Sequence, residues 1–285
     1  MMAKILKGKD VADSLNKNLI TRTEILRSRG VVPTLGIIRL GERADDMAYE
    51  RGAVKRAEAT GVDVRVFSYP EDISGEDLLL EIDKLNEDKS IHGILVFRPL
   101  PSHIDDEKIR NSIAPEKDVD GISDVSQVGV YTGDAKGYPP CTAEACMELL
   151  KFYGIEVKGK KVAVIGRSQV IGKPVAMMLI KSDATVTVCH TKTLDLKGIC
   201  KNSDIIIASA GHIGTVTREY LSPGQVVIDV AINFDDENKM VGDVEFEEAE
   251  KIVAGITPVP GGVGAVTTGI LMKHCVEAAE KSLAE

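Results

Sequence analysis

Short apolar runs alternate with amphipathic stretches along nearly the whole chain. In the first half the runs TLGIIRL, VDVRVFS and IHGILVFR are rich in Val and Ile and are bounded by Gly, Pro or charge, which is typical of buried strands. Helical spacing of apolar residues predicts helices over 8–29, 44–60 and 74–88. Strands that alternate with helices predict a parallel sheet covered on both faces.

The second half repeats this pattern, with strands expected in KVAVIG, TVTVCH, DIIIASA, QVVIDVAI and KIVAGI. A final helix is expected in VTTGILMKHCVEAAEKSLA, after a Gly-rich loop. Between the halves, residues 98–142 are rich in Pro, Gly and Asp and show little periodicity. We interpret this stretch as a long connection that lines a site and holds one helix near 105–112.

The bulk composition narrows the class of protein. A chain of 285 residues can form two domains or one large one, and 35 basic against 44 acidic residues give a net charge of −9. This charge argues against non-specific binding to nucleic acid or anionic membranes, and no apolar run approaches the ~18 residues of a membrane span.

Five scattered cysteines without a CxxC pair predict reduced thiols in a cytoplasmic protein. Five histidines without ligand spacing predict no metal site.

The strongest local signal is the turn after KKVAVIG. Gly166 ends this predicted strand, Gly172 opens the next helix, and Ser168 stands where a tight-turn glycine often occurs. This order presents backbone N–H groups and a helix N-terminus to a dinucleotide pyrophosphate. The turn departs from the simple GxGxxG form, so a plain strand-to-helix turn remains the alternative.

The end of the next strand indicates which dinucleotide would bind. An NAD-binding protein usually places Asp or Glu there to hold the ribose 2′-hydroxyl. This chain has His190, Thr191 and Lys192 instead, and Arg167 lies in the preceding turn. Basic and hydroxyl groups suit a 2′-phosphate, which favours NADP and leaves NAD as the alternative.

Seven stretches together carry a family resemblance. They are KDVDGI (117–122), PPCTAEACMELL (139–150), GRSQVIGKPVAMML (166–179), TVTVCHTKT (185–193), VVIDVAIN (226–233), GDV (242–244) and ITPVPGGVGAVTTGIL (256–271). In this order they resemble the methylenetetrahydrofolate dehydrogenase/methenyltetrahydrofolate cyclohydrolase family (FolD-type), over essentially the whole chain.

The resemblance implies an α/β fold of two lobes around a cleft. Residues 1–143 plus 264–285 would form a catalytic, folate-binding lobe, and 144–263 a Rossmann-type NAD(P)-binding lobe through which a homodimer forms. The implied cofactor-binding residues are Gly166, Arg167, Ser168, Thr191 and Ile232. The implied substrate-binding residues are Tyr49, Asp120, Pro260, Gly261, Gly262 and Gly264, of which Tyr49 and Asp120 would be catalytic.

Three of these assignments have simpler alternatives. A carboxylate at Asp120 could accept paired hydrogen bonds from the amino and ring N–H groups of a pterin, or it could only cap the turn at Gly121. The glycines of PGGVG could form only a turn, although three in five residues favour close approach of the backbone to a ligand. For Cys141 we expect a packing role and no nucleophilic one.

Two positions depart from the family in a way that bears on mechanism. Members with both activities carry a lysine four residues after the tyrosine, and a glutamine that hydrogen-bonds it. Here Ala53 takes the lysine position and Phe97 the glutamine position, while Lys55 is six residues from Tyr49. A spacing of six turns a helical side chain about 240° away from the first, so Lys55 is expected to point elsewhere.

The missing lysine affects the two family reactions differently. Hydride transfer needs alignment and a dry site, whereas hydrolysis of the methenyl bridge needs proton transfer, and acid–base help contributes roughly 10²–10⁴-fold. Arg98 is a poor substitute because its pKa is too high. The sequence therefore predicts a dehydrogenase whose cyclohydrolase activity is lost or weak. The alternatives are a bifunctional enzyme that gives 10-formyltetrahydrofolate and a non-catalytic folate- or dinucleotide-binding protein.

Overall fold

The computed structural model describes residues 2–134 and 136–283, and the chain divides into two compact units. The six-stranded unit contains residues 2–12 and 142–267, and the three-stranded unit contains 13–141 and 268–283 apart from position 135. The sequence placed the whole amino-terminal segment in the first lobe and the second division at 263/264. In the structure residues 2–12 belong to the six-stranded unit, because Lys4–Ile5 pairs there with Gly255–Ile256.

The three-stranded unit is built on a parallel sheet of order β3-β2-β4. Its strands are β2 (Thr34–Leu40), β3 (Asp63–Tyr69) and β4 (Gly93–Val96). The central strand β2 is buried throughout, as its unbroken apolar run predicts. The expectation of a buried strand was wrong for β3, since each of its residues is exposed or half-buried. It lies at one edge of the sheet.

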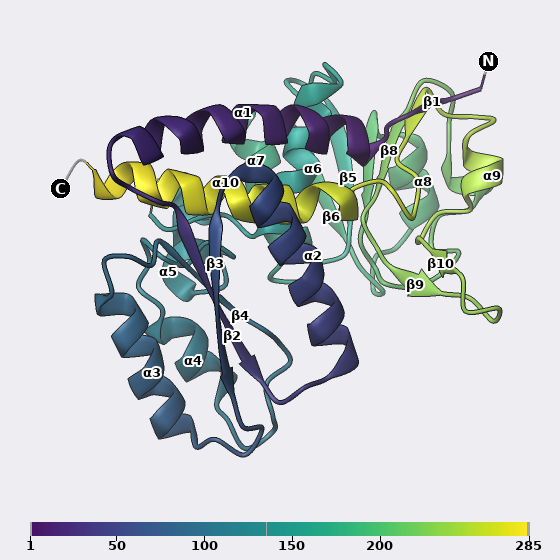
Figure 1. Cartoon of the computed structure of the whole chain (residues 1–285). Helices are drawn as coiled ribbons and strands as arrows, with labels where there is room; N and C mark the ends of the chain where they lie inside the picture. Colours follow the sequence, from purple (N-terminus) through teal and green to yellow (C-terminus); the bar gives the residue numbers. More distant parts are fainter. Residues whose placement is uncertain (1, 135, 284–285) are drawn as a thin grey trace. The chain divides into compact units, whose positions relative to one another are not determined.

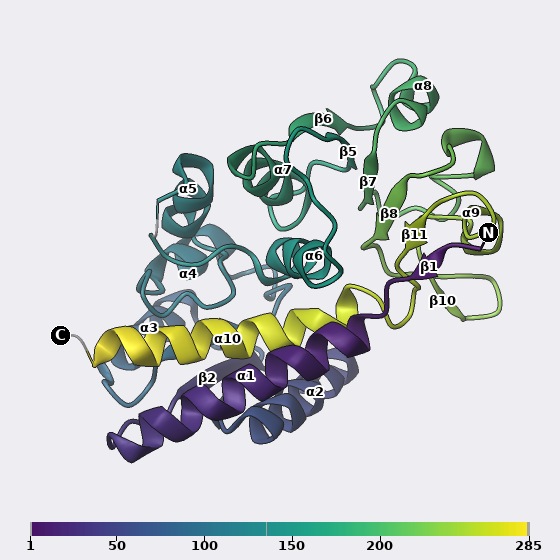
Figure 2. The ribbon, with the colours of Figure 1, turned by 90° about the horizontal axis from the view of Figure 1, so that it is seen from above.

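Within residues 2–134 and 136–283, six helices accompany this sheet. They are α1 (Gly8–Ser28), α2 (Ala44–Thr60), α3 (Gly75–Glu87), α4 (Asp106–Ser112), α5 (Asp124–Thr132) and α10 (Gly264–Ser282). Helices α1 and α10 lie side by side in both views (Figures 1 and 2), and Arg22 joins them through an ion pair to Glu280 at 2.6 Å. The expected last helix reaches residue 284, which lies outside the described residues.

The connection between the halves is more ordered than its composition predicts. The expected helix near 105–112 is present as α4, with Asp105 as its N-cap. A second helix, α5, follows between a Ser123 N-cap and Gly133 in the left-handed conformation. The sequence analysis missed α5 because the helix has only nine residues, and its start depends on a cap that only the folded turn before it positions.

The six-stranded unit is a parallel sheet of order β1-β11-β8-β7-β5-β6. Its strands are β1 (Lys4–Ile5), β5 (Lys161–Ile165), β6 (Thr185–Cys189), β7 (Ile205–Ala208), β8 (Val226–Asp229) and β11 (Gly255–Ile256). Four of the expected strands of the second half are present as β5, β6, β7 and β8, whereas of the expected strand KIVAGI only the last two residues, Gly255–Ile256, form a strand. Helix α7 (Gly172–Lys181) packs on β5 and β6. The other elements are α6 (Cys141–Phe152), α8 (Leu196–Lys201), η1 (Arg218–Tyr220), α9 (Phe246–Ala249) and the hairpin β9 (Asn233–Phe234)–β10 (Met240–Val241).

Candidate active site

The turn from β5 to α7 needs glycine at both of its ends. Gly166 has φ +121°, and a Cβ there would lie 2.4 Å from the Ser209 carbonyl oxygen. A Cβ on Gly172 would lie 2.2 Å from the Gly166 carbonyl oxygen. Ser168 Oγ accepts hydrogen bonds from the N–H groups of Ile171 (3.2 Å) and Gly172 (3.4 Å). The turn therefore leads directly from β5 into the start of α7, the arrangement of a phosphate-binding loop, and the Ser168 hydroxyl takes up the N–H groups of Ile171 and Gly172.

The structure also brings the basic residues of two strand ends together. The Gly166 N–H donates to the Cys189 carbonyl at 2.9 Å, which ties the end of β5 to the end of β6. His190 Nδ1 accepts from the Lys192 N–H at 3.1 Å and shapes the turn that carries Thr191. The side chains of Arg167 and Lys192 are exposed at this shared edge. The cluster inferred for a 2′-phosphate therefore lies at one end of the sheet.

A cavity of about 280 Å³ lies within the six-stranded unit, at the end of β8. Its lining includes Ile232 and the Pro260–Gly264 loop, which the sequence assigned to the cofactor and to the folate respectively. Gly261 has φ +99°, and a Cβ on Gly264 would come within 3.9 Å of the Ile232 side chain. The two assignments thus meet in one cavity, where a nicotinamide and a folate would have to be adjacent for hydride transfer.

Two buried carboxylates hold the loops around this cavity, and the sequence analysis did not single them out. Asp229 accepts from the N–H groups of Asp243 (3.1 Å) and Val244 (3.0 Å). Asp243 accepts from three successive N–H groups, 210–212, at 2.6–3.1 Å. Burial raises the pKa of Asp229 to about 7, and the Asp243 charge adds to this. The only sequence signal was the GDV motif itself.

In the three-stranded unit Tyr49 lies on α2 and packs edge-on against Phe97, with ring centroids 5.6 Å apart and planes at 90°. Ala53, one helical turn further on, is fully buried, and Phe97 is 8% exposed. Lys55 is exposed, and so is Tyr49 at 41%; that Lys55 points away from Tyr49 stays a prediction. The positions of the family's lysine and glutamine are therefore occupied by two apolar side chains, both buried.

The turn before Asp120 leaves its carboxylate available. Asp118, and not Asp120, caps the turn: its carboxylate accepts from the N–H groups of Ile122 (3.1 Å) and Ser123 (2.8 Å). Burial, with the Asp118 charge as a second cause, raises the pKa of Asp120 to about 6. Although the Tyr49 residue is 41% exposed, desolvation of its hydroxyl group and the Asp120 charge raise its pKa. Tyr49 and Asp120 thus belong to one electrostatically coupled site.

Cys141 does more than pack in the core. Its thiol donates to the Val119 carbonyl at 3.3 Å and hydrogen-bonds the Asp120 carboxylate. His274 Nδ1 lies 2.8 Å from the same carbonyl oxygen and 3.7 Å from Cys141 Sγ. The expected packing role was incomplete because His274, from α10, is 133 residues away in the chain and no local pattern links the two.

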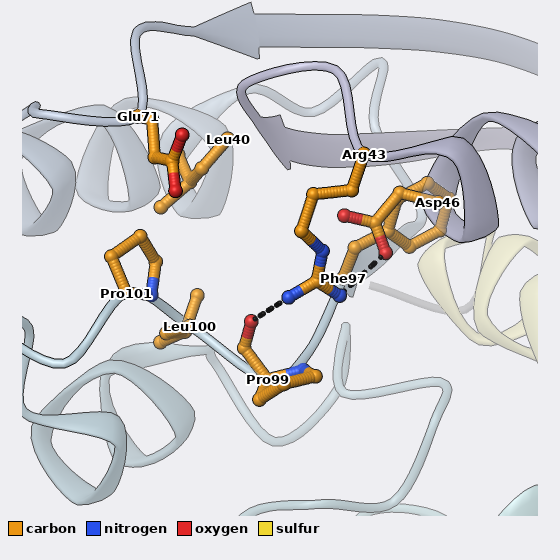
Figure 3. Close-up of a pocket in the computed structure, with 8 residues that line it drawn as sticks. All are labelled: Leu40, Arg43, Asp46, Glu71, Phe97, Pro99, Leu100 and Pro101. Atoms are coloured by element: carbon orange, nitrogen blue, oxygen red, sulfur yellow. Dashed lines mark hydrogen bonds and ion pairs between the residues drawn. The ribbon is translucent and has the colours of Figure 1, made fainter.

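A smaller cavity of about 50 Å³ lies beside Phe97 (Figure 3). The Arg43 guanidinium lies between the Asp46 carboxylate and the Pro99 carbonyl oxygen, at 2.9 Å from each. Arg98 turns to Asp106 and forms a two-pronged ion pair with it. The cavity has room for a few water molecules and is far too small for a folate. These contacts fix the segment that carries Phe97.

The described residues carry neither a metal-ligand cluster nor a membrane-spanning helix. Within 2–134 and 136–283, no three His, Cys, Asp or Glu side chains gather closely enough to hold a metal ion. None of the helices in that part of the chain has the length and apolar character needed to cross a membrane. In the same residues all five cysteines are buried and form no disulfide.

A parallel sheet with a glycine-bounded strand-to-helix turn defines a dinucleotide-binding α/β unit, here accompanied by a second α/β unit with its own coupled Tyr–Asp pair. Family models for tetrahydrofolate dehydrogenase/cyclohydrolase match residues 6–120 (catalytic domain) and 140–283 (NAD(P)-binding domain). The chain belongs to this family, as the sequence resemblance predicted.

Relatives match over nearly their whole length. The bifunctional protein FolD of Carboxydothermus hydrogenoformans is 49% identical over 281 residues, covering 98% of each chain. The crystal structure of bifunctional FolD from Campylobacter jejuni superposes with a TM-score of 0.95 at 38% identity, covering 98% of this chain and 99% of that one. FolD of Trypanosoma brucei, solved with NADP cofactor and an inhibitor, gives a TM-score of 0.92 at 38% identity, with both chains fully covered. These relatives favour the bifunctional alternative over loss of the hydrolytic activity.

Proposed function

We propose that this protein is an NADP-dependent 5,10-methylenetetrahydrofolate dehydrogenase of one-carbon metabolism. The reaction moves a hydride from the methylene carbon of the folate to the cofactor and leaves 5,10-methenyltetrahydrofolate. The observation that carries the proposal is the pairing of the glycine-bounded 166–172 turn with the coupled Tyr49–Asp120 site, in a chain that its relatives match from end to end.

The residues of the six-stranded unit fit an NADP molecule. The spaces at Gly166 and Gly172 that a Cβ would fill keep the turn close to the sheet, so its N–H groups and the start of α7 would hold the pyrophosphate. Arg167, Thr191 and Lys192 would hold the 2′-phosphate. Bound nicotinamide supplies the hydride acceptor, and Ile232 with the Pro260–Gly264 loop would keep water from its ring.

The residues of the three-stranded unit fit a pterin. The Asp120 carboxylate would accept paired N–H donors, and this requires its ionised form. Tyr49 would present its ring and a protonated phenol to the substrate, since its pKa is raised. The step breaks a C–H bond, and the electron pair leaves with the hydrogen while the folate nitrogens stabilise the cation. No acid or base is needed, so Ala53 does not impair this reaction.

The second candidate activity is hydrolysis of the methenyl bridge to 10-formyltetrahydrofolate, which the bifunctional relatives favour. Water adds to the methenyl carbon, one C–N bond breaks, and a proton is released. With Ala53 and Phe97 apolar and buried, no amine stands where the family resemblance places one. We therefore expect this activity to be retained but weak, reduced by roughly 10²–10⁴-fold, the usual contribution of acid–base help.

We also propose a cytoplasmic homodimer formed through the six-stranded unit. Its edge strand β6 is largely exposed, including Val188 at 39%, and an open strand edge is a ready pairing surface. Light scattering on the purified protein would give twice the monomer mass. A Val188→Lys variant would give the monomer mass, and an unchanged dimer in that variant would place the interface elsewhere.

One incubation tests the enzymatic proposal. Purified protein receives methylenetetrahydrofolate with NADP⁺ or NAD⁺, and reduced cofactor, methenyl and formyl products are followed separately. We expect rapid reduction of NADP⁺, with methenyl accumulating ahead of formyl. Formyl that keeps pace with reduced cofactor would show full hydrolysis without the lysine. No turnover with either cofactor would favour the non-catalytic alternative.

A further inference from the structure

Two buried side chains from distant helices converge on a single backbone carbonyl next to Asp120. Val119 O receives the Cys141 thiol at 3.3 Å and His274 Nδ1 at 2.8 Å. A carbonyl oxygen only accepts, so Nδ1 of His274 carries the proton. Cys141 and His274 are 3% and 1% exposed. The peptide that leads into Asp120 is thus held from α6 and from α10 at once.

The same two residues face the Asp120 carboxylate, together with a small set of other charged groups. Cys141 hydrogen-bonds the carboxylate, and His274 and Arg98 act on it through their charge. Asp118, on the same turn, opposes its ionisation, and Tyr49 on α2 is coupled to it. On the other side of His274 the Tyr138 ring packs at 4.9 Å, which fixes the imidazole in place.

We propose that Cys141 and His274 are positioning residues for Asp120: they hold the Val119–Asp120 peptide so that the carboxylate is presented, ionised, to the pterin. This inference rests on the proposed folate-binding function. Neither residue touches substrate. The thiol shares its one proton between the Val119 carbonyl oxygen and the Asp120 carboxylate, and the imidazole fixes the peptide plane from which the carboxylate projects.

The direction of the pH effect follows from these contacts. Burial and Asp118 raise the pKa of Asp120, while the hydrogen bond from Cys141 and the charge of His274 lower it. Removing the thiol should raise the pKa of Asp120 further. Since only the ionised carboxylate accepts both N–H donors, activity is lost as the pH falls through that pKa. In a plot of activity with the folate substrate against pH, the acid limb should therefore move to higher pH.

The test compares Cys141→Ala and Cys141→Ser with Cys146→Ala as matched control. Cys146 lies on the same helix, is equally buried and donates to the Thr142 carbonyl at 3.3 Å. We expect Cys141→Ala to raise KM for the folate at least tenfold at neutral pH, with KM for NADP unchanged and the acid limb moved upward. Cys141→Ser should restore much of the loss, because its hydroxyl donates to the same acceptors. Cys146→Ala should leave KM and pH profile unchanged.

A second pair of variants tests the imidazole. His274→Asn keeps a donor near the Nδ1 position, while His274→Phe keeps a ring against Tyr138 and removes the donor. We expect the larger rise in folate KM for His274→Phe. An effect of His274→Asn equal to or larger than that of His274→Phe would mean that the Nδ1 donor does not matter, and the positioning role of His274 would be abandoned.

A titration without substrate separates this inference from the proposed function. NMR of protein labelled at the aspartate carboxyl carbons, assigned with Asp120→Asn, follows Asp120 directly. A higher midpoint in Cys141→Ala would support the inference even if the wild-type protein showed no turnover. An Asp120 titration and a folate pH profile both indistinguishable from wild type in Cys141→Ala would overturn it.

Discussion

At the scale of single residues, position 53 decides which proton chemistry α2 can offer. Ala53 is one helical turn after Tyr49 and has no exposed surface, and Phe97 packs against the Tyr49 ring. A buried amine needs a hydrogen-bond partner, and an unpaired buried charge costs several kcal/mol or neutralises. Ala53 and Phe97 pack as two apolar side chains and leave no polar group without a partner. Introducing a lysine or a glutamine alone should therefore not restore the hydrolytic function.

We therefore expect Ala53→Lys to leave the hydrolytic rate unchanged and to lower the free energy of unfolding by several kcal/mol. The double variant Ala53→Lys, Phe97→Gln offers the amine an amide partner and should raise formyl production above wild type. Product analysis by absorbance at the methenyl band and denaturant unfolding measure the two effects. Robust hydrolysis in the single variant would contradict the coupled-loss argument.

Arg167 is a second single residue with a defined consequence: we expect it to determine the preference for NADP over NAD. A charged hydrogen bond contributes roughly 1.5–3 kcal/mol, so Arg167→Ala should raise KM for NADP by about ten- to a hundredfold. KM for NAD should change little, because NAD lacks the 2′-phosphate. Lys160→Ala removes an exposed charge at the opposite end of β5 and serves as control. Equal weakening of both cofactors by Arg167→Ala would remove the 2′-phosphate assignment.

At the scale of elements, two helical glycines have opposite consequences. Gly52, within α2, has nothing within 4 Å of an added Cβ, whereas Gly172, at the start of α7, would place that Cβ 2.2 Å from the Gly166 carbonyl oxygen. Gly52→Ala should stabilise the protein by ~0.5–1 kcal/mol, because alanine loses less backbone freedom. Gly172→Ala should destabilise it by about 1–3 kcal/mol and displace the phosphate turn.

Thermal unfolding and NADP titration distinguish the two variants. Gly172→Ala should lose at least about tenfold in NADP affinity, and Gly52→Ala should bind like wild type. If Gly172→Ala bound NADP normally, the close approach of turn and helix would have no part in binding the cofactor.

The elements that sequence predicts best are those whose apolar pattern is both long and buried. β2 and α2 were predicted close to their bounds, and the 166–172 turn was identified because glycine spacing reports directly on backbone conformation. By contrast α5 was missed, since its start depends on the Ser123 cap and on the Asp118 turn before it. The exposure of β3 was missed for a related reason: its apolar residues do not show that it is an edge strand.

Contacts between residues that are distant in sequence could not be predicted either. The Cys141–Val119–His274 cluster joins three segments of the chain. The sequence of each segment contains no pattern that indicates contact with the other two. The Asp229–Asp243 pair was quoted only as part of motifs, because its hydrogen bonds are to backbone N–H groups that the sequence does not reveal.

At the scale of the whole molecule, the division of the chain into two units also depends on a contact between residues distant in sequence. β1 has two residues, too short for any periodicity to report. Its pairing with β11, some 250 positions later, places residues 2–12 in the six-stranded unit. The fold class was predicted because it depends on the alternation of strands and helices, whereas the exact course of the chain between units depends on pairings that only folding establishes.

The stability of the whole molecule should depend on pH through its buried carboxylates. Burial raises the pKa of Asp229 to about 7, from an ordinary value of 3.8. The folded state therefore keeps a proton that the unfolded chain releases between these values. The stabilising contribution is complete below pH 3.8 and is lost as the pH rises through about 7. Asp120, with its pKa raised to about 6, contributes in the same direction.

We expect the free energy of unfolding of the wild-type protein to carry a downward slope between pH 5 and 8 that Asp229→Asn reduces. The total contribution of such a shift is on the order of a few kcal/mol. The amide cannot ionise, yet it also loses an acceptor for the Asp243 and Val244 N–H groups, which lowers stability by a constant amount at every pH. The test is therefore the slope of the unfolding free energy against pH and not its offset: denaturant unfolding is measured at several pH values, with Asp236→Asn, at an exposed position, as control. If the difference in unfolding free energy between wild type and Asp229→Asn stays constant across this range, Asp229 does not titrate there. The Asp229 carboxylate beside the cavity would then keep its charge from pH 5 upward.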